Sequence, residues 1–148
     1  IAPMVKKWWK LRYQLMPYIV EQSKKATETG YPVLRALIFH HPEDKLCWHI
    51  DDEYYFGDDF LVAPVMNSEN RRDVYLPEGK WVNFFTGERY EGGQWLKNLE
   101  IPLEEMPVYV RENASISVYN KEVDCTDEMD LNQSEILRID HTFKGIWK

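Results

Sequence analysis

Two neighbouring histidines, His40 and His41, are the residues whose type and position could most directly do chemistry. They follow an apolar run over residues 32–39, and an imidazole can act as a general acid or base near neutral pH. Neighbours in an extended chain face opposite ways, so only one of the two can enter a given cleft. His40 and His41 are therefore candidate substrate contacts. The alternative is a rim histidine bonded to backbone or to a carboxylate.

An acidic cluster follows the histidines, and paired carboxylates can serve as acid, base or nucleophile. Acids crowded into a turn-rich stretch more often form a solvated face with some helix capping. We therefore assign no catalytic residue within this cluster, and expect Asp58 to accept hydrogen bonds from turn or strand-entry amides. The cluster consists of Asp51, Asp52, Glu53, Asp58 and Asp59.

Three further residues bear on partners and cofactors. Arg35 is a charge inside the apolar run 32–39, and its burial would require a partner, so we predict a structural ion pair. Cys47 and Cys125 lie far apart without a CxxC or Cys/His pattern, which favours free thiols and predicts no zinc site. No metal and no cofactor are predicted.

The elements that must position these residues begin with a helix over residues 5–29. Pro17 should kink or divide this helix because it removes a backbone donor and crowds the preceding turn, and Gly30 supplies the C-cap. The next segment, 32–39, is apolar without alternation, as expected of a strand covered on both faces. A helix followed by such a strand predicts a parallel α/β unit. The apolar helix positions recur every three or four residues: Trp8, Leu11, Leu15, Tyr18, Ile19, Gln22 and Ala26.

A further strand at 60–66 ends near Asn67. From there the pattern changes to short strands separated by turn signals every ten residues or so, which is typical of an antiparallel sandwich or barrel. An acidic, apolar-poor stretch from residue 119 to about 133 is interpreted as a linker. A last strand at 135–139 is assigned to another module. The expected strands are 60–66, 73–76, 81–85, 95–101, 107–110 and 115–118.

Composition limits the function classes. Hydrophobic residues make up 44% of the 148 residues and the formal net charge is −7, which allows a real core but argues against a nucleic-acid partner. No apolar run approaches the roughly 20 residues of a membrane helix, and no signal-peptide pattern opens the chain. We therefore expect a cytoplasmic protein without a membrane partner. Both ends of the sequence look cut, so we expect a piece of a longer chain.

Six segments in order, from about residue 8 to 118, resemble glycoside hydrolases of family 31. Arg12-Tyr13-Gln14-Leu15-Met16-Pro17-Tyr18 resembles that family's RYxLxPY helix, and Gly57-Asp58-Asp59-Phe60-Leu61-Val62-Ala63-Pro64-Val65 resembles its GDxLLVAPV segment. The other similar segments are Pro32-Val33-Leu34-Arg35, Val74-Tyr75-Leu76-Pro77-Glu78-Gly79-Lys80-Trp81, Tyr90-Glu91-Gly92-Gly93 and Met106-Pro107-Val108-Tyr109-Val110-Arg111. The chain departs from the family at His40-His41-Pro42, where Glu-Phe-Pro is usual, and at Ala36, where Pro is common.

The resemblance implies an α+β fragment: the last helix and strand of a (β/α)8 barrel, followed by an antiparallel β-sandwich domain. The corresponding boundaries are 1–62 for the end of the catalytic barrel, 63–118 for the sandwich, and 119–148 for a linker and the start of a distal β module. It also implies a retaining α-glycosidase whose two carboxylates lie about 5–5.5 Å apart. The family carries both on earlier barrel strands, so no catalytic residue is assigned here and the chain alone should be inactive.

The expected parent enzyme hydrolyses terminal α-linked xylose or glucose from oligosaccharides in carbohydrate metabolism, and it binds them through the missing barrel. The sequences of residues 76–81 and 107–113 resemble those of α-xylosidases more than those of α-glucosidases, which are the second candidate. A free-standing carbohydrate-binding β-module is the alternative, and an acidic interaction domain is a third class. Without its barrel neighbours, the apolar strand should make the chain self-associate through residues 8–39.

Aromatic residues of the predicted sandwich could stack on a sugar ring, but packing between two sheets is their more common role. We therefore expect Trp81 and Trp95 to be mostly buried. The full set is Trp81, Phe84, Phe85, Tyr90 and Trp95.

Overall fold

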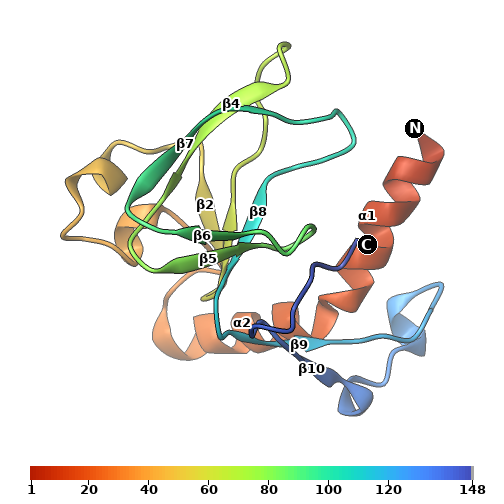
Figure 1. Cartoon of the computed structure of the whole chain (residues 1–148). Coiled ribbons are helices and arrows are strands. Elements are labelled where there is room, and N and C mark those ends of the chain that lie inside the picture. The colour runs from red at the N-terminus through yellow and green to blue at the C-terminus, as the bar shows by residue number, and fades with distance from the viewer. Residues whose placement is uncertain (148) are drawn as a thin grey trace. The chain divides into compact units, whose positions relative to one another are not determined.

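A computed structural model describes residues 1–147 of the chain (Figure 1). The chain forms two compact units: Ile1–Tyr31 together with Ser115–Arg138, and Pro32–Ala114 together with the segment that starts at Ile139. These units divide the chain at different places from the predicted domains 1–62, 63–118 and 119–148. Those domains, as parts of a longer protein, stay a prediction.

The first unit contains two helices, α1 (Ala2–Gln14) and α2 (Met16–Thr29). They separate at Leu15, and Pro17 occupies the first turn of α2, where its missing N–H donor costs no helical hydrogen bond. The prediction that Pro17 kinks or divides the helix is therefore confirmed. Gly30 ends α2 in the left-handed conformation, with φ of 78°, and its N–H donates to the Ala26 carbonyl at 2.9 Å.

The same unit contains an antiparallel pair, β9 (Ser115–Val118) and β10 (Glu135–Arg138). Two short 3-10 turns, η3 (Thr126–Glu128) and η4 (Leu131–Gln133), lie between them. The Tyr119 N–H donates to the Gln14 carbonyl at 2.8 Å, and Ser117 Oγ donates to Glu21 at 3.1 Å. The segment expected to open a distal module therefore pairs with β9.

The second unit is built on a six-stranded antiparallel sheet in the order β1-β2-β3-β8-β5-β6. A separate antiparallel ribbon joins β4 (Arg71–Leu76) to β7 (Gln94–Glu100), with a bulge between Arg72 and Val74 (Figure 1). These strands confirm the antiparallel β-structure predicted after residue 60. The sheet strands are β1 (Leu34–Arg35), β2 (Tyr54–Phe56), β3 (Phe60–Val62), β5 (Lys80–Asn83), β6 (Arg89–Glu91) and β8 (Val108–Arg111).

One apolar cluster joins the ribbon to the six-stranded sheet, because β4 contributes Val74 and Leu76 and the sheet contributes Leu61 and Trp81. Trp81 is 1% exposed, as predicted, and its indole N–H donates to the Pro77 carbonyl at 2.9 Å. Trp95 is 37% exposed, so the prediction that it is mostly buried is wrong. Among the described strands, β7 pairs with β4 alone, and most side chains of β7 are exposed.

The predicted strand over 32–39 is also wrong in extent. Only Leu34 and Arg35 form β1, which pairs antiparallel with β2, and Leu37–Phe39 forms a 3-10 turn, η1. The amides of His40 and His41 donate to the Leu37 carbonyl and close this turn instead of extending a strand. β1 has a hydrogen-bonded neighbour on one side in the described chain, and Leu34 (59%) and Phe39 (50%) are exposed. No described strands pair in parallel, so the parallel α/β unit and the barrel are not seen here.

Candidate functional site

The candidate histidines lie on the loop between β1 and β2, which also carries the 3-10 turn η2 (Lys45–Trp48). The His40 ring lies 4.1 Å from the Tyr55 ring, between centroids, and Arg35 Nη1 lies 3.0 Å from His40 Nε2. His41 Nε2 lies 2.6 Å from Tyr55 Oη, and Arg111 Nη2 donates to the same hydroxyl at 3.2 Å. Both histidines therefore contact side chains of this same unit.

These contacts define the protonation state of the pair. A guanidinium can only donate, so Arg35 requires a lone pair on His40 Nε2, and burial together with Arg111 and Arg35 lowers the pKa of His40 to about 4. Tyr55 Oη accepts from Arg111 and is free to donate its proton to His41 Nε2. Burial and Arg111 likewise lower the pKa of His41, and burial raises the pKa of Tyr55. Two neutral imidazoles are poor proton donors at pH 7, and substrate contact by either stays a prediction.

Arg35 forms the ion pair that its position in an apolar run requires. Its side chain is 4% exposed, with Nη1 2.8 Å from Asp58 Oδ1 and Nε donating to the Pro32 carbonyl at 2.6 Å. The prediction of a structural ion pair is confirmed. Asp58 thus serves the Arg35 guanidinium and, through it, fixes the start of the histidine loop.

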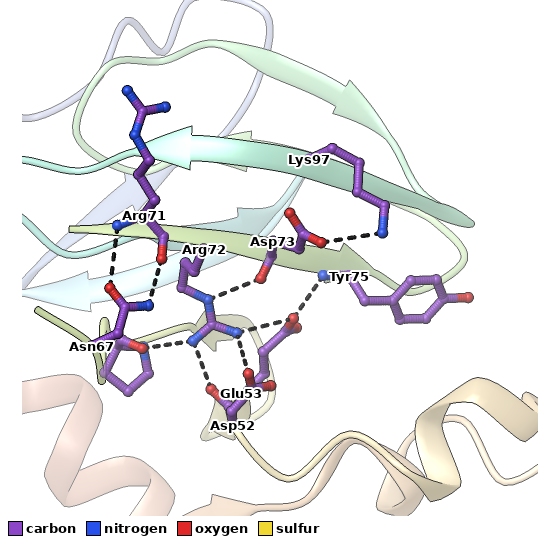
Figure 2. Close-up of polar contacts among 9 residues, drawn as sticks. Asp52, Glu53, Asn67, Arg71, Arg72, Asp73, Tyr75 and Lys97 are labelled. Atoms are coloured by element: carbon purple, nitrogen blue, oxygen red, sulfur yellow. Dashed lines mark hydrogen bonds and ion pairs between the residues drawn. The ribbon is translucent and has the colours of Figure 1, made fainter. Parts of the chain in front are cut away.

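A second polar cluster anchors the other end of the loop to β4 (Figure 2). Arg72 Nη2 lies 3.1 Å from Asp52 Oδ2 and 3.5 Å from Glu53 Oε1, and Arg72 Nη1 donates to the carbonyls of Asp52 and Pro64. Glu53 Oε1 also accepts from the Tyr75 N–H at 2.6 Å. Two members of the acidic cluster, Asp52 and Glu53, therefore hold the loop in place.

Glu53 is the most perturbed carboxylate of this cluster. Its side chain is fully buried, and this burial raises its pKa to about 7, although the Tyr75 N–H and Arg72 favour the charged form. Asp52 raises the pKa of Glu53 further. Sequence reasoning missed Arg72 as the partner, because the two residues lie on segments separated by the whole of β2 and β3.

A hollow of about 340 Å³ opens between the histidine loop and the β4–β7 ribbon. Within it, Tyr75 Oη donates to Asp44 Oδ2 at 2.5 Å, and Asp44 Oδ1 accepts from the Leu46 N–H and so caps η2. Burial alone would raise the pKa of Asp44, but these hydrogen bonds outweigh it and the pKa is lowered. The Pro-Glu-Asp turn signal at residues 42–44 could have pointed to Asp44 as a cap. The lining residues are His41, Glu43, Asp44, Tyr75, Glu78 and Gly93.

Residues 1–147 contain no group of three or more His, Cys, Asp or Glu side chains placed to hold a metal ion. Cys47 is a buried free thiol and Cys125 an exposed one. In the same part of the chain, no helix has the length and apolar character needed to cross a membrane.

The second unit is an antiparallel β-domain whose loop between β1 and β2 is held at both ends by ion pairs. The protein-family model described as the glycosyl hydrolase family 31 C-terminal domain matches residues 30–116, more than half of the chain. The chain belongs to glycosyl hydrolase family 31.

Relatives support the same assignment. "Alpha-glucosidase 2" of Bacillus thermoamyloliquefaciens is 38% identical over 116 residues, covering 78% of this chain and 15% of that protein. "Alpha-xylosidase" of Saccharolobus solfataricus is 32% identical over 127 residues, covering 84% and 17%. A solved family 31 α-xylosidase from a soil metagenome, complexed with xylose, has 44% identity and a TM-score of 0.72 over 76% of this chain and 17% of that one. The chain thus spans about one sixth of the length of these relatives.

Proposed function

We propose that this chain is part of a retaining α-glycosidase that hydrolyses terminal α-linked xylose or glucose from oligosaccharides. Relatives of both kinds support the substrate class, since one is named an α-glucosidase and another an α-xylosidase. The family uses a pair of carboxylates for this reaction, and the resemblance assigns both to sequence that precedes this chain. The contribution of residues 1–148 is then structural.

The observation that carries this role is the double anchoring of the loop between β1 and β2. Arg35 and Asp58 hold its start, and Arg72 holds its end through Asp52 and Glu53. If this chain aligns with family 31 enzymes as its motifs imply, this loop follows the last barrel strand, at the rim where barrel enzymes assemble their active sites. The β-domain would therefore keep one rim loop in a fixed conformation beside the catalytic centre.

Between the two substrates we favour the α-xyloside. The sequence of residues 76–81 and 107–113 leans that way, and a solved α-xylosidase shares 44% identity with this chain. Among the curated relatives the order is reversed, with 38% for the α-glucosidase and 32% for the α-xylosidase. The α-glucoside is the second candidate, since specificity would depend on barrel loops outside this sequence.

The test is to recover the coding sequence upstream of Ile1, to express the longer protein, and to assay p-nitrophenyl α-xyloside against the α-glucoside. Activity on either substrate, with none for the 148-residue chain alone, supports the proposal. If the upstream sequence does not encode a barrel with two aspartate motifs, the proposal is refuted. That result would favour the alternative of a free-standing carbohydrate-binding β-module.

A further inference from the structure

The hollow beside the β4–β7 ribbon has an exposed aromatic ring at its edge. Trp95 stands opposite Tyr75 in the register of the ribbon, their ring centroids are 5.2 Å apart, and Tyr75 itself lines the hollow. Gly93, two residues before Trp95, lines it too. Trp95 is 37% exposed, and the Lys97 ammonium, 4.8 Å from the centroid of its ring, covers part of this ring.

The lining of the hollow is rich in hydrogen-bond acceptors. The Asp44 carboxylate accepts from the Leu46 N–H, from Tyr75 Oη and from the Cys47 thiol, and two carboxylate oxygens with two lone pairs each can accept one further hydrogen bond. Glu43 and Glu78 are exposed and add two more carboxylates. The volume of about 340 Å³ lies within the range of small-molecule sites.

We propose that this hollow and Trp95 form a binding site for a neutral saccharide. A pyranose presents an apolar face that can pack on the indole, and its hydroxyls donate to the carboxylates of Asp44, Glu43 and Glu78. An anionic ligand is disfavoured by the three carboxylates. A metal ion is disfavoured because the described residues offer no ligand group of three.

The choice of saccharide rests on the proposed function, but the site itself does not. Binding here requires no hydrolysis and can be measured on the 148-residue chain. An inactive longer protein would therefore refute the proposed function without affecting the proposed site. An active glycosidase whose 148-residue C-terminal chain binds no sugar would refute the site and leave the proposed function intact.

The experiment is a titration of the chain with maltotriose and with a xylose-terminated oligosaccharide, followed by calorimetry and tryptophan fluorescence. We expect saturable binding with a millimolar dissociation constant, weakened at least about fivefold in Trp95→Ala through loss of the stacking surface. Leu103→Ala is the control, since Leu103 is 79% exposed and lies outside both the hollow and residues 8–39, and its binding should equal that of the wild type. Lys97→Ala uncovers the Trp95 ring and should bind at least as tightly as the wild type.

Glu78→Gln, with exposed Glu69→Gln as its control, tests the polar side of the site and should weaken binding where the control does not. Circular dichroism and urea unfolding of each variant ensure that lost binding is not lost folding. Absence of saturable heat with both sugars, equal weakening in Trp95→Ala and Leu103→Ala, or binding of a simple amine but not of sugars would each overturn the proposal.

Discussion

The buried carboxylate of Glu53 should make the stability of this protein depend on pH in an unusual direction. Its pKa is about 7 in the folded chain, against 4.5 for an unperturbed glutamate. The folded state therefore binds this proton more tightly than the unfolded state does. The stabilisation is complete below pH 4.5 and is lost as the pH rises through 7. The difference between these two pKa values corresponds to about 3 kcal/mol of unfolding free energy.

The perturbation is Glu53→Gln, which keeps an oxygen for the Tyr75 N–H but cannot ionise. Arg72 keeps its ion pair with Asp52, 3.1 Å away. Above pH 7 we expect the variant to be more stable than the wild type by up to about 3 kcal/mol, and below pH 4.5 we expect the two to be equal. The other titratable groups facing Glu53 are Cys47, Tyr55, Tyr75 and Tyr109, for each of which burial raises the pKa.

The assay is urea unfolding of wild type and variant at a series of pH values from 4 to 9, and the quantity of interest is the difference between their unfolding free energies. Subtraction is necessary because the lowered pKa values of His40 and His41 make the folded protein less stable as the pH falls. In the wild type alone, this loss would mask the opposite pH dependence that Glu53 causes. Exposed Glu69→Gln is the control and should follow the wild type throughout. A difference between Glu53→Gln and wild type that does not vary with pH would show that Glu53 has an ordinary pKa, and the reasoning from burial would be refuted.

The remaining predictions concern packing, activity and association. Trp81→Ala should cost roughly 3–5 kcal/mol of unfolding free energy, and Trp95→Ala less than about 1 kcal/mol, in urea unfolding at one pH; equal costs would contradict the assigned burial. The 148-residue chain should hydrolyse neither p-nitrophenyl α-xyloside nor the α-glucoside above the buffer rate, and turnover abolished by His41→Ala would show otherwise. We also propose that the chain self-associates through residues 8–39. Light scattering should then show an average molar mass that rises with protein concentration and that is lower for Phe39→Ser than for the wild type. A wild-type protein that is monomeric at every concentration would refute this.

Much of the secondary structure was predictable because its signals are local. Helix periodicity, Pro17 and Gly30 located α1, α2 and the break between them, since a helix closes its hydrogen bonds four residues apart. Turn residues placed the short strands after residue 60 for the same reason, because they act within a few positions of where they stand. The family could be recognised likewise, as its motifs are contiguous stretches of sequence.

The partners of the polar residues were only partly predictable. A charge in an apolar run had to be paired, so Arg35 could be assigned an ion pair, but its partner Asp58 lies 23 residues away and was expected to serve backbone amides. Nothing in the local sequence indicated that Glu53 would be buried against Arg72. Such pairs depend on which strands become neighbours, and that is a property of the whole sheet.

By itself, the sequence determined the helices, most strands and the family of this protein, because each rests on patterns shorter than about one element. Tertiary structure decided which apolar residues are covered. Trp81 and Trp95 look alike in sequence, yet Trp81 lies in the buried apolar cluster, whereas Trp95 lies on a ribbon strand with a single described neighbour. The run 32–39 has the composition of a buried strand but forms two strand residues and a turn. Burial is a relation between distant segments, and apolar composition sets only the free energy that would be gained if a partner covers the residue.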